Sequence, residues 1–285
     1  MGAIGEAVLY AAAKRLYRTE VAQTSEMKAA LSDIDSYDRF REGEAEKVMA
    51  ALARYCIEIA GKRVMDFGCN DGALSVRYRA AGASKVVGVD IDAKALERAR
   101  QLRAGIEFVQ SDVDRIPVPD SSVDLIVSFD VFEHVAHPEP ILAEMRRVLA
   151  PGGCAVIGTI GWWSPFAPHL WSTMPVPWAH VAFSERTVLR TCRRVYHSPW
   201  YRPNMHDLDE GGNRVADKYT GDSISRDYLN HYLIRDFERA FRSRGFQFQT
   251  HTVPIHDMAA LRPFCRIPWM RELISASVWF VLTAR

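Results

Sequence analysis

A glycine-containing turn follows an apolar run near residue 65. Residues 64–74 read VMDFGCNDGAL, and the G-x-G-x-x-G/A spacing of a dinucleotide-binding turn falls on Gly68, Asn70 and Ala73. The middle position is normally glycine, so that backbone can approach a pyrophosphate, and here it is asparagine. Asparagine tolerates the left-handed conformation at modest cost. The segment therefore predicts a ligand-binding turn whose ligand lacks a pyrophosphate.

A second carboxylate stands where a ribose would need one. Asp66 ends the first apolar run, and Asp90 ends the next one, KVVGVD, 24 residues later. A carboxylate about 20 residues beyond such a turn can accept hydrogen bonds from the 2′ and 3′ hydroxyls of a ribose. The spacing therefore indicates a nucleoside ligand.

The elements that must position these residues alternate between apolar runs and helical patterns. This alternation predicts a parallel, doubly wound sheet with right-handed crossovers, in which the turn and Asp90 lie at the carboxyl edge, where such sheets bind ligands. The expected strands are residues 62–67, 85–90, 106–110, 123–129 and 154–160, and the expected helices are residues 73–82, 93–105 and 138–149.

The alternation stops after Ile160 and resumes about sixty residues later. A helix is expected at residues 233–244, followed by strands at 246–255 and 277–284, with at most one helical turn near 270–274. We expect a Rossmann-like α/β fold with a mostly parallel seven-stranded sheet and an antiparallel last strand. The expected parts are an N-terminal helical segment (1–60), a cofactor-binding core (61–160), an inserted aromatic-rich cap (161–222) and the C-terminal part of the core (223–285).

Four segments in order resemble the class I S-adenosylmethionine-dependent methyltransferases of the small-molecule type. VMDFGCNDGALS is similar to their first motif, VVGVDID to the ribose motif, SDVDRIPVPDSSVDLIVS to the adenine motif with the fourth strand, and LAPGGCAVIGT to the entry of the fifth strand. The resemblance covers residues 40–160 well and the last two strands loosely. S-adenosylmethionine contains no phosphate, which agrees with the asparagine in the turn.

The resemblance implies a set of cofactor contacts. The first motif would line the methionine and ribose, the second would bind the ribose hydroxyls, the third would contact adenine, and backbone after the fourth strand would hold the amino acid end. Arg41 would pair with the cofactor carboxylate. The residues at these positions are Asp66, Gly68, Cys69, Asn70, Gly72, Asp90, Ile91, Asp112, Val113, Ser128 and Phe129.

The segment FDVFEHVAHP after the fourth strand allows two interpretations. In ubiquinone-pathway O-methyltransferases a similar E-x-x-E-H pattern is associated with a divalent metal, and Asp130, Glu133 and His134 stand at the matching positions. Alternatively, Glu133 and His134 orient one another or bond to backbone, and we favour this metal-free interpretation. His134 is the expected general base, with His180 of the cap as a second candidate.

The expected cap holds many large rings. Most should form a satellite hydrophobic core, and a minority should line a substrate pocket. The rings are Trp162, Trp163, Phe166, Trp171 and Trp178, and the polar candidates beside them are His169, His180, Tyr196, His206 and Tyr219.

Composition limits the partners. The formal net charge is +1, which gives no reason to expect a nucleic-acid partner. The five cysteines have no metal-ligand spacing and no disulfide framework, so we expect reduced thiols and a cytoplasmic protein. No apolar run approaches the ~18 residues of a membrane span, and the N-terminus is typical of an amphipathic helix rather than a secretory signal. No signal for an oligomeric state is visible.

These features together predict transfer of a methyl group from S-adenosylmethionine to a small molecule by in-line displacement, with S-adenosylhomocysteine as the product. The favoured acceptor is a hydroxyl oxygen of a natural product, a sugar or a lipid-linked intermediate, and the alternative is a small amine. Two other classes remain open at this point: a non-catalytic S-adenosylmethionine-binding module and a nicotinamide-dependent oxidoreductase.

Overall fold

The computed structural model describes residues 2–19, 34–170, 172–204, 207–209, 211–217 and 219–284. The chain divides into two compact units. Met1–Arg41 and Trp163–Arg226 form one, called the helical unit below, and Glu42–Trp162 and Asp227–Arg285 form the other, called the sheet unit.

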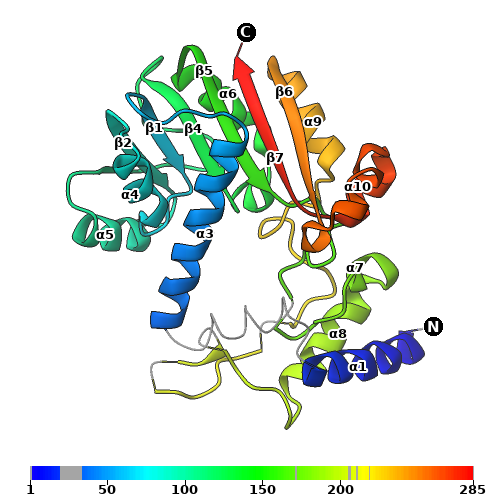
Figure 1. Cartoon of the computed structure of the whole chain (residues 1–285). Helices are drawn as coiled ribbons and strands as arrows, with labels where there is room; N and C mark the ends of the chain where they lie inside the picture. The colour runs from blue at the N-terminus through cyan, green and yellow to red at the C-terminus, as the bar shows by residue number, and fades with distance from the viewer. Residues whose placement is uncertain are drawn as a thin grey trace. The chain divides into compact units, whose positions relative to one another are not determined.

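A seven-stranded sheet forms the centre of the sheet unit. Its order is β3-β2-β1-β4-β5-β7-β6, and β7 runs antiparallel to both of its neighbours (Figure 1). The predicted Rossmann-like sheet with an antiparallel last strand is confirmed. The strand order reverses between β1 and β4, which is where such sheets bind ligands. The strands are β1 Arg63–Phe67, β2 Lys85–Asp90, β3 Glu107–Gln110, β4 Val123–Phe129, β5 Leu149–Thr159, β6 Phe246–Pro254 and β7 Ser275–Ala284.

Helices cover both faces of the sheet because successive strand residues are apolar and point to opposite sides. On β4, Leu125 packs with Leu52 of α3 (Ile34–Arg54) on one face, beside α4 (Ala73–Ala80). The next residue, Ile126, belongs to the core cluster that contains Met145 of α6 (Pro138–Val148) and Phe241 of α9 (Ile234–Ser243). These two helices lie on the other face of the sheet (Figure 1). The amphipathic helix α5 (Ala93–Leu102) packs near Phe108 of β3. The sheet edge is therefore rigidly supported from both sides.

Short helical turns link β6 to β7. They are η3 Ile255–Asp257, η4 Ala259–Leu261, η5 Phe264–Arg266 and α10 Pro268–Ile274. The carboxylate of Glu272 is buried and accepts hydrogen bonds from the backbone N–H groups of Ile234 and Arg235, at 2.8 and 3.1 Å. Burial raises the pKa of this carboxyl. The connection therefore caps the first turn of α9 from a distant part of the chain.

The helical unit contains α1 (Gly2–Thr19), α7 (Ala179–Ala182) and α8 (Glu185–Tyr196). The expected N-terminal amphipathic helix is α1, whose Leu9 and Ala13 are buried where it packs on α8. Among the described helices, none is both long and apolar enough to cross a bilayer.

Among the described residues of the helical unit, the fully buried aromatic rings are tyrosines. Tyr196, Tyr201 and Tyr219 are at most 4% exposed. Their hydroxyls find partners inside, since Tyr196 donates to the Val215 carbonyl at 2.9 Å and Tyr201 to the Asp207 carboxylate at 2.6 Å. Trp162, Trp163, Phe166 and Trp178 are half-buried, and Trp171 and His206 lie outside the described residues.

Candidate cofactor-binding and active site

The turn between β1 and α4 depends on three left-handed residues. Gly68, Asn70 and Gly72 have φ angles of 79°, 49° and 77°. The expectation that Asn70 adopts this conformation is confirmed. A Cβ atom at Gly72 would lie 2.6 Å from the Phe108 ring, and one at Gly68 would collide with the Val131 side chain. Only glycine fits at these two positions.

The backbone N–H groups of this turn are used by the chain itself. Those of Gly68 and Cys69 donate to the Val89 carbonyl, at 2.7 and 3.1 Å. The N–H of Asn70 donates to a carboxylate oxygen of Asp90 at 2.8 Å. Donors that would bind a phosphate in a dinucleotide site are therefore engaged across β1 and β2.

The backbone N–H groups at the N-terminus of α4 also donate to groups of the chain itself. The Gly72 N–H donates to the Cys69 carbonyl at 2.9 Å, and the Ala73 N–H donates to the Asp71 carboxylate at 3.3 Å. The Asp71 carboxylate lies where an anion would otherwise bind. Arg103 lies 3.9 Å from it and also donates to the Asp71 carbonyl. The first two N–H donors at this helix end are therefore already engaged by the chain.

Asp90 is fixed at the end of β2. Its second carboxylate oxygen accepts a hydrogen bond from the Asp92 N–H at 2.9 Å, so both oxygens are oriented by backbone. Asp92 itself caps α5, accepting from the N–H groups of Lys94 and Ala95. The Asp90 side chain therefore faces the β1–α4 turn, where the sequence predicted it.

Apolar side chains follow β2 and β3 at the same edge. Ile91 is 60% exposed and Val113 is 75% exposed, directly after two strands that pair with each other. Asp112 is exposed, and its carboxylate has no hydrogen-bond or ion-pair partner among the residues that the structure describes. Two solvent-exposed apolar side chains beside an unpaired acceptor suit a flat, amino-bearing ring.

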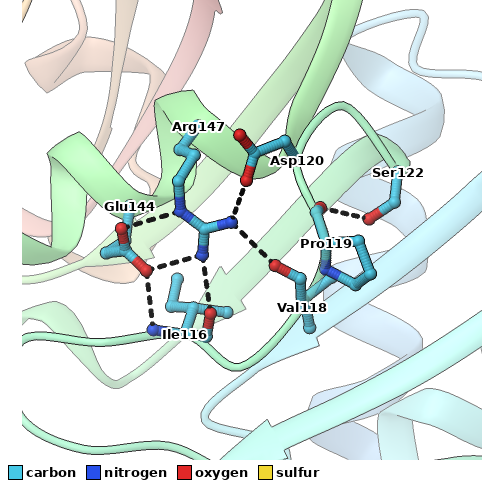
Figure 2. Close-up of polar contacts among 7 residues, drawn as sticks. All are labelled: Ile116, Val118, Pro119, Asp120, Ser122, Glu144 and Arg147. Atoms are coloured by element: carbon cyan, nitrogen blue, oxygen red, sulfur yellow. Dashed lines mark hydrogen bonds and ion pairs between the residues drawn. The ribbon is translucent and has the colours of Figure 1, made fainter.

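Arg147 of α6 binds residues 116, 118 and 120 of the loop between β3 and β4 (Figure 2). Its guanidinium donates to the carbonyls of residues 116 and 118, at 2.7 and 2.9 Å, and to the carboxylate of residue 120 at 2.6 Å. Glu144 accepts from the same guanidinium and from the N–H of residue 116. The hydrogen bonds from Arg147 lower the pKa of Glu144. One side chain thus holds three residues in the middle of the loop.

Two predicted contact residues are buried. The Asp66 carboxylate accepts a hydrogen bond from the Ser75 hydroxyl at 2.6 Å and is 3% exposed. The Cys69 thiol is also buried, and burial, reinforced by Asp66 and Asp90, raises its pKa. Asp66 therefore holds the turn onto α4, and Cys69 is a neutral thiol rather than a nucleophile.

Ser128 and Phe129 also turn their side chains inward. Ser128 is fully buried, and its hydroxyl has no partner among the described residues. Phe129 stacks on Trp279 of β7, with ring centroids 5.3 Å apart. The backbone of this pair is the part that we assigned to the amino acid end.

The segment after β4 forms the 3₁₀ turn η1 (Phe132–His134). The Glu133 carboxylate is buried and accepts a hydrogen bond from the Thr159 hydroxyl at 2.7 Å, and burial raises its pKa. The Nδ1 atom of His134 lies 2.8 Å from the Tyr228 carbonyl oxygen. Because a carbonyl can only accept, Nδ1 carries the proton, and Nε2 is the proton-accepting nitrogen of the neutral ring.

Asn230 supports this turn from far along the chain. Its side-chain amide donates to the carbonyls of Phe132 and Val135, at 2.5 and 2.7 Å, and its N–H donates to the Glu133 carbonyl at 2.7 Å. Neither Asn230 nor Tyr228 was predicted as a site residue. No local sequence signal marks them, because their partners lie more than ninety residues earlier.

Two predicted site residues belong to the helical unit. Arg41 is its last residue before the chain continues along α3 into the sheet unit, and its guanidinium forms no ion pair with any described residue. His180 lies on α7, which follows Trp178 and its left-handed backbone (φ 56°). Their assigned roles remain predictions.

Comparison with known proteins points to one family. Residues 65–157 match the family described as methyltransferase domain. An uncharacterised methyltransferase of Mycobacterium ulcerans is 33% identical over 141 residues, which are 49% of this chain and 53% of the relative. A second, from Mycolicibacterium vanbaalenii, is 38% identical over 113 residues, covering 39% and 44%. The matched region is thus about half the length of these curated relatives.

A solved structure shares the fold. The S-adenosylmethionine dependent methyltransferase of Mesorhizobium loti is similar over 82% of this chain and 95% of its own, with a TM-score of 0.52 and 20% identity. The matching family and the sheet order agree with the motifs at the carboxyl edge. Residues 65–157 are therefore similar to a methyltransferase domain, and the chain shares the fold of an S-adenosylmethionine-dependent methyltransferase.

Proposed function

We propose that this protein binds S-adenosylmethionine at the carboxyl edge of β1–β4 and transfers its methyl group to a small-molecule acceptor. The observation that carries the proposal is that the turn's N–H donors already bind acceptors of the turn and of β2, at Gly68, Cys69, Asn70, Gly72 and Ala73. A pyrophosphate needs such donors. The ammonium, ribose hydroxyls and adenine amino group of S-adenosylmethionine need acceptors instead.

Acceptors and apolar surface are what this edge provides. Each Asp90 oxygen takes one backbone N–H and has lone-pair capacity for a ribose hydroxyl. Ile91 and Val113 would flank the adenine ring, and the Asp112 carboxylate would accept from its amino group. Backbone near Ser128 would hold the amino acid end, and Arg41 would pair with its carboxylate.

The chemistry requires alignment more than charge stabilisation. When bound, the cofactor supplies an electrophilic methyl group on a sulfonium whose charge disappears during transfer. The chain's task is to hold an acceptor in line with that methyl group, and such positioning alone can contribute up to ~7–11 kcal/mol of barrier reduction. A rigid edge, supported by α3 and α6, is suited to this task.

We further propose that the acceptor is a hydroxyl and that His134 takes its proton. The hydrogen bond from Nδ1–H to the Tyr228 carbonyl fixes the ring so that Nε2 is the basic nitrogen. A hydroxyl must lose a proton during transfer, whereas a neutral amine needs only an acceptor contact. His180 is the second candidate base.

Calorimetric titration tests cofactor binding. We expect S-adenosylmethionine and S-adenosylhomocysteine to bind and NADH not to bind. Binding of NADH alone would place the chain among nicotinamide enzymes. Turnover of S-adenosylmethionine with a panel of phenols, sugars and amines then separates an enzyme from a non-catalytic binding module, which would bind the cofactor without product.

The variant His134→Asn tests the base. Asparagine can keep an N–H donor near the Tyr228 carbonyl but has no basic nitrogen. We expect turnover of a hydroxyl acceptor to fall by about 10²–10⁴, with cofactor affinity unchanged. Full activity of this variant would exclude His134 as the base and leave His180→Asn as the next variant to measure.

A further inference from the structure

The connection between β6 and β7 exposes an unusual amount of apolar surface. Met258, Phe264, Ile267 and Trp269 are 49%, 43%, 38% and 62% exposed. All four lie within a dozen residues, on η3–α10 at the β6 edge of the sheet (Figure 1). Large apolar side chains clustered in this way indicate a surface that is covered by something else.

The same segment is strongly basic. Residues 258–271 contain Arg262, Arg266 and Arg271 and no acidic residue, although the whole chain has a net charge of only +1. Arg54, at the end of α3, lines the same cavity of about 490 Å³ as these arginines. The positive charge is therefore concentrated on one small surface.

Part of this charge has no partner. Arg262 pairs with Asp257 at 3.0 Å, and Arg271 pairs with Glu238 at 2.6 Å. The guanidinium groups of Arg54 and Arg266 form no ion pair within the part of the chain that the structure describes. The cavity between them is therefore suited to a phosphate group.

The combination favours an anionic bilayer over a protein. Tryptophan and phenylalanine prefer the membrane–water interface, and arginine can lay its stem along apolar surface while its charged head reaches lipid phosphates. A second copy of this chain is disfavoured, because a twofold contact would bring the same arginines against one another. Charge and apolarity together fit a lipid surface.

We propose that residues 258–271, with Arg54, form a docking surface for an anionic lipid bilayer. Phe264 and Trp269 enter the interface, and Arg262 and Arg266 bind lipid phosphates. This surface, called the lipid-facing patch below, is separate from the predicted cofactor contacts. The proposal does not rest on methyl transfer.

Co-sedimentation with vesicles tests the proposal. We expect the full chain to sediment with vesicles of phosphatidylcholine and phosphatidylglycerol, weakly with phosphatidylcholine alone, and less at high salt. Replacing both Arg262 and Arg266 by glutamine should lower partitioning about 25-fold, at about fivefold per arginine. Replacing Phe264 and Trp269 by serine should also abolish most binding. Quenching by brominated lipid should disappear in Trp269→Phe while sedimentation persists.

Matched variants keep the test specific. Arg77 on α4 and Arg98 on α5 are exposed and form no ion pair with any residue that the structure describes, so their double glutamine variant should sediment like the unmodified protein. The double serine variant of Ile4 and Val8, which are 75% and 57% exposed on α1, tests the other apolar surface. Unchanged sedimentation of the patch variants, or loss only in the α1 variant, would overturn the proposal.

Two further measurements separate the outcomes. Light scattering shows whether the protein is a dimer. If the unmodified protein is a dimer that does not bind vesicles, and Trp269→Ser makes it monomeric, the patch is an interface between copies and the proposal is overturned. Calorimetry with S-adenosylmethionine on each variant reports whether the sheet unit is folded. If the protein binds S-adenosylmethionine but not vesicles, the lipid proposal is wrong and the proposed function is unaffected.

Discussion

The two sides of the predicted cofactor site are built from different ranges of the chain. On the β1–β2 side, the Asn70 N–H meets the Asp90 carboxylate, 20 residues away, and Asp90 meets the Asp92 N–H. On the β4 side, Phe132 is held by Asn230, 98 residues away, and His134 by the Tyr228 carbonyl, 94 residues away. One side is a local turn and the other is a long-range assembly.

The local side and the long-range side are expected to contribute to different properties, the first to cofactor binding and the second to stability. Asp90 is only partly buried, and its carboxylate is available to a ligand. Asn230 is 6% exposed, and its side-chain hydrogen bonds lie within the protein. A change on the local side should therefore weaken cofactor binding in a folded protein, and a change on the long-range side should weaken the fold.

The largest effect is expected for Asp90→Ala. Two charge-assisted hydrogen bonds to ribose are worth about 1.5–3 kcal/mol each, so S-adenosylmethionine affinity should fall by about 10²–10⁴ in calorimetry. Asp92→Ala is the matched control, since it removes only the α5 cap and should cost about 1 kcal/mol of unfolding free energy without changing affinity. Equal affinity of Asp90→Ala and the unmodified protein would contradict the ribose assignment.

Asn230→Ala tests the other side. It leaves the Phe132 and Val135 carbonyls without their amide partner in a buried place, which should lower the unfolding free energy by about 2–3 kcal/mol. Denaturant titration measures this loss, and cofactor affinity at low temperature should change little. Asn213→Ala, at an exposed asparagine, should cost much less. If Asn230→Ala is as stable as the unmodified protein but does not bind the cofactor, the long-range side contributes to binding rather than to stability.

Arg147→Met should moderately lower both the cofactor affinity and the unfolding free energy. The loop of residues 112–122 loses its anchor, so affinity should fall less than in Asp90→Ala, and stability should fall by about 1–3 kcal/mol. The pKa of Glu144 is lower in the folded protein than in the unfolded chain. The stability that ionised Glu144 contributes is therefore fully present above its pKa in the unfolded chain, and it is lost as the pH falls through its pKa in the folded protein. The difference in unfolding free energy between the unmodified protein and Arg147→Met should therefore become smaller at acidic pH.

Arg146→Met is the control for Arg147. Arg146 lies on the same helix and donates to the Arg244 carbonyl instead of the loop, so its loss should leave cofactor affinity unchanged. If both variants bind equally well, the loop does not depend on Arg147.

The smallest effects are expected at Asn70. Because its φ is 49°, Asn70→Ala should cost about 1–2 kcal/mol, whereas Asn70→Gly should be neutral within about 0.5 kcal/mol. Thermal unfolding distinguishes the two. Cofactor affinity should survive in Asn70→Gly, because the backbone, not the amide side chain, forms the turn.

Most of the sheet and the local half of the site were predictable from sequence. The strand positions, the left-handed Asn70 and the Asp92 cap follow from apolar periodicity and turn chemistry within short windows. The burial of Asp66 was not predicted, because its spacing carries no sign of the Ser75 hydroxyl that binds it.

By itself, then, the sequence determined which elements form and which residues stand at their carboxyl ends, because these depend on neighbours a few residues away. Only the tertiary structure decided that Asn230 and Tyr228 support the turn after β4 and that Glu272 caps α9. It also decided that Tyr196, Tyr201 and Tyr219 are buried in the helical unit. These partners are distant along the chain, and packing of complete elements is what brings their polar groups within hydrogen-bond distance.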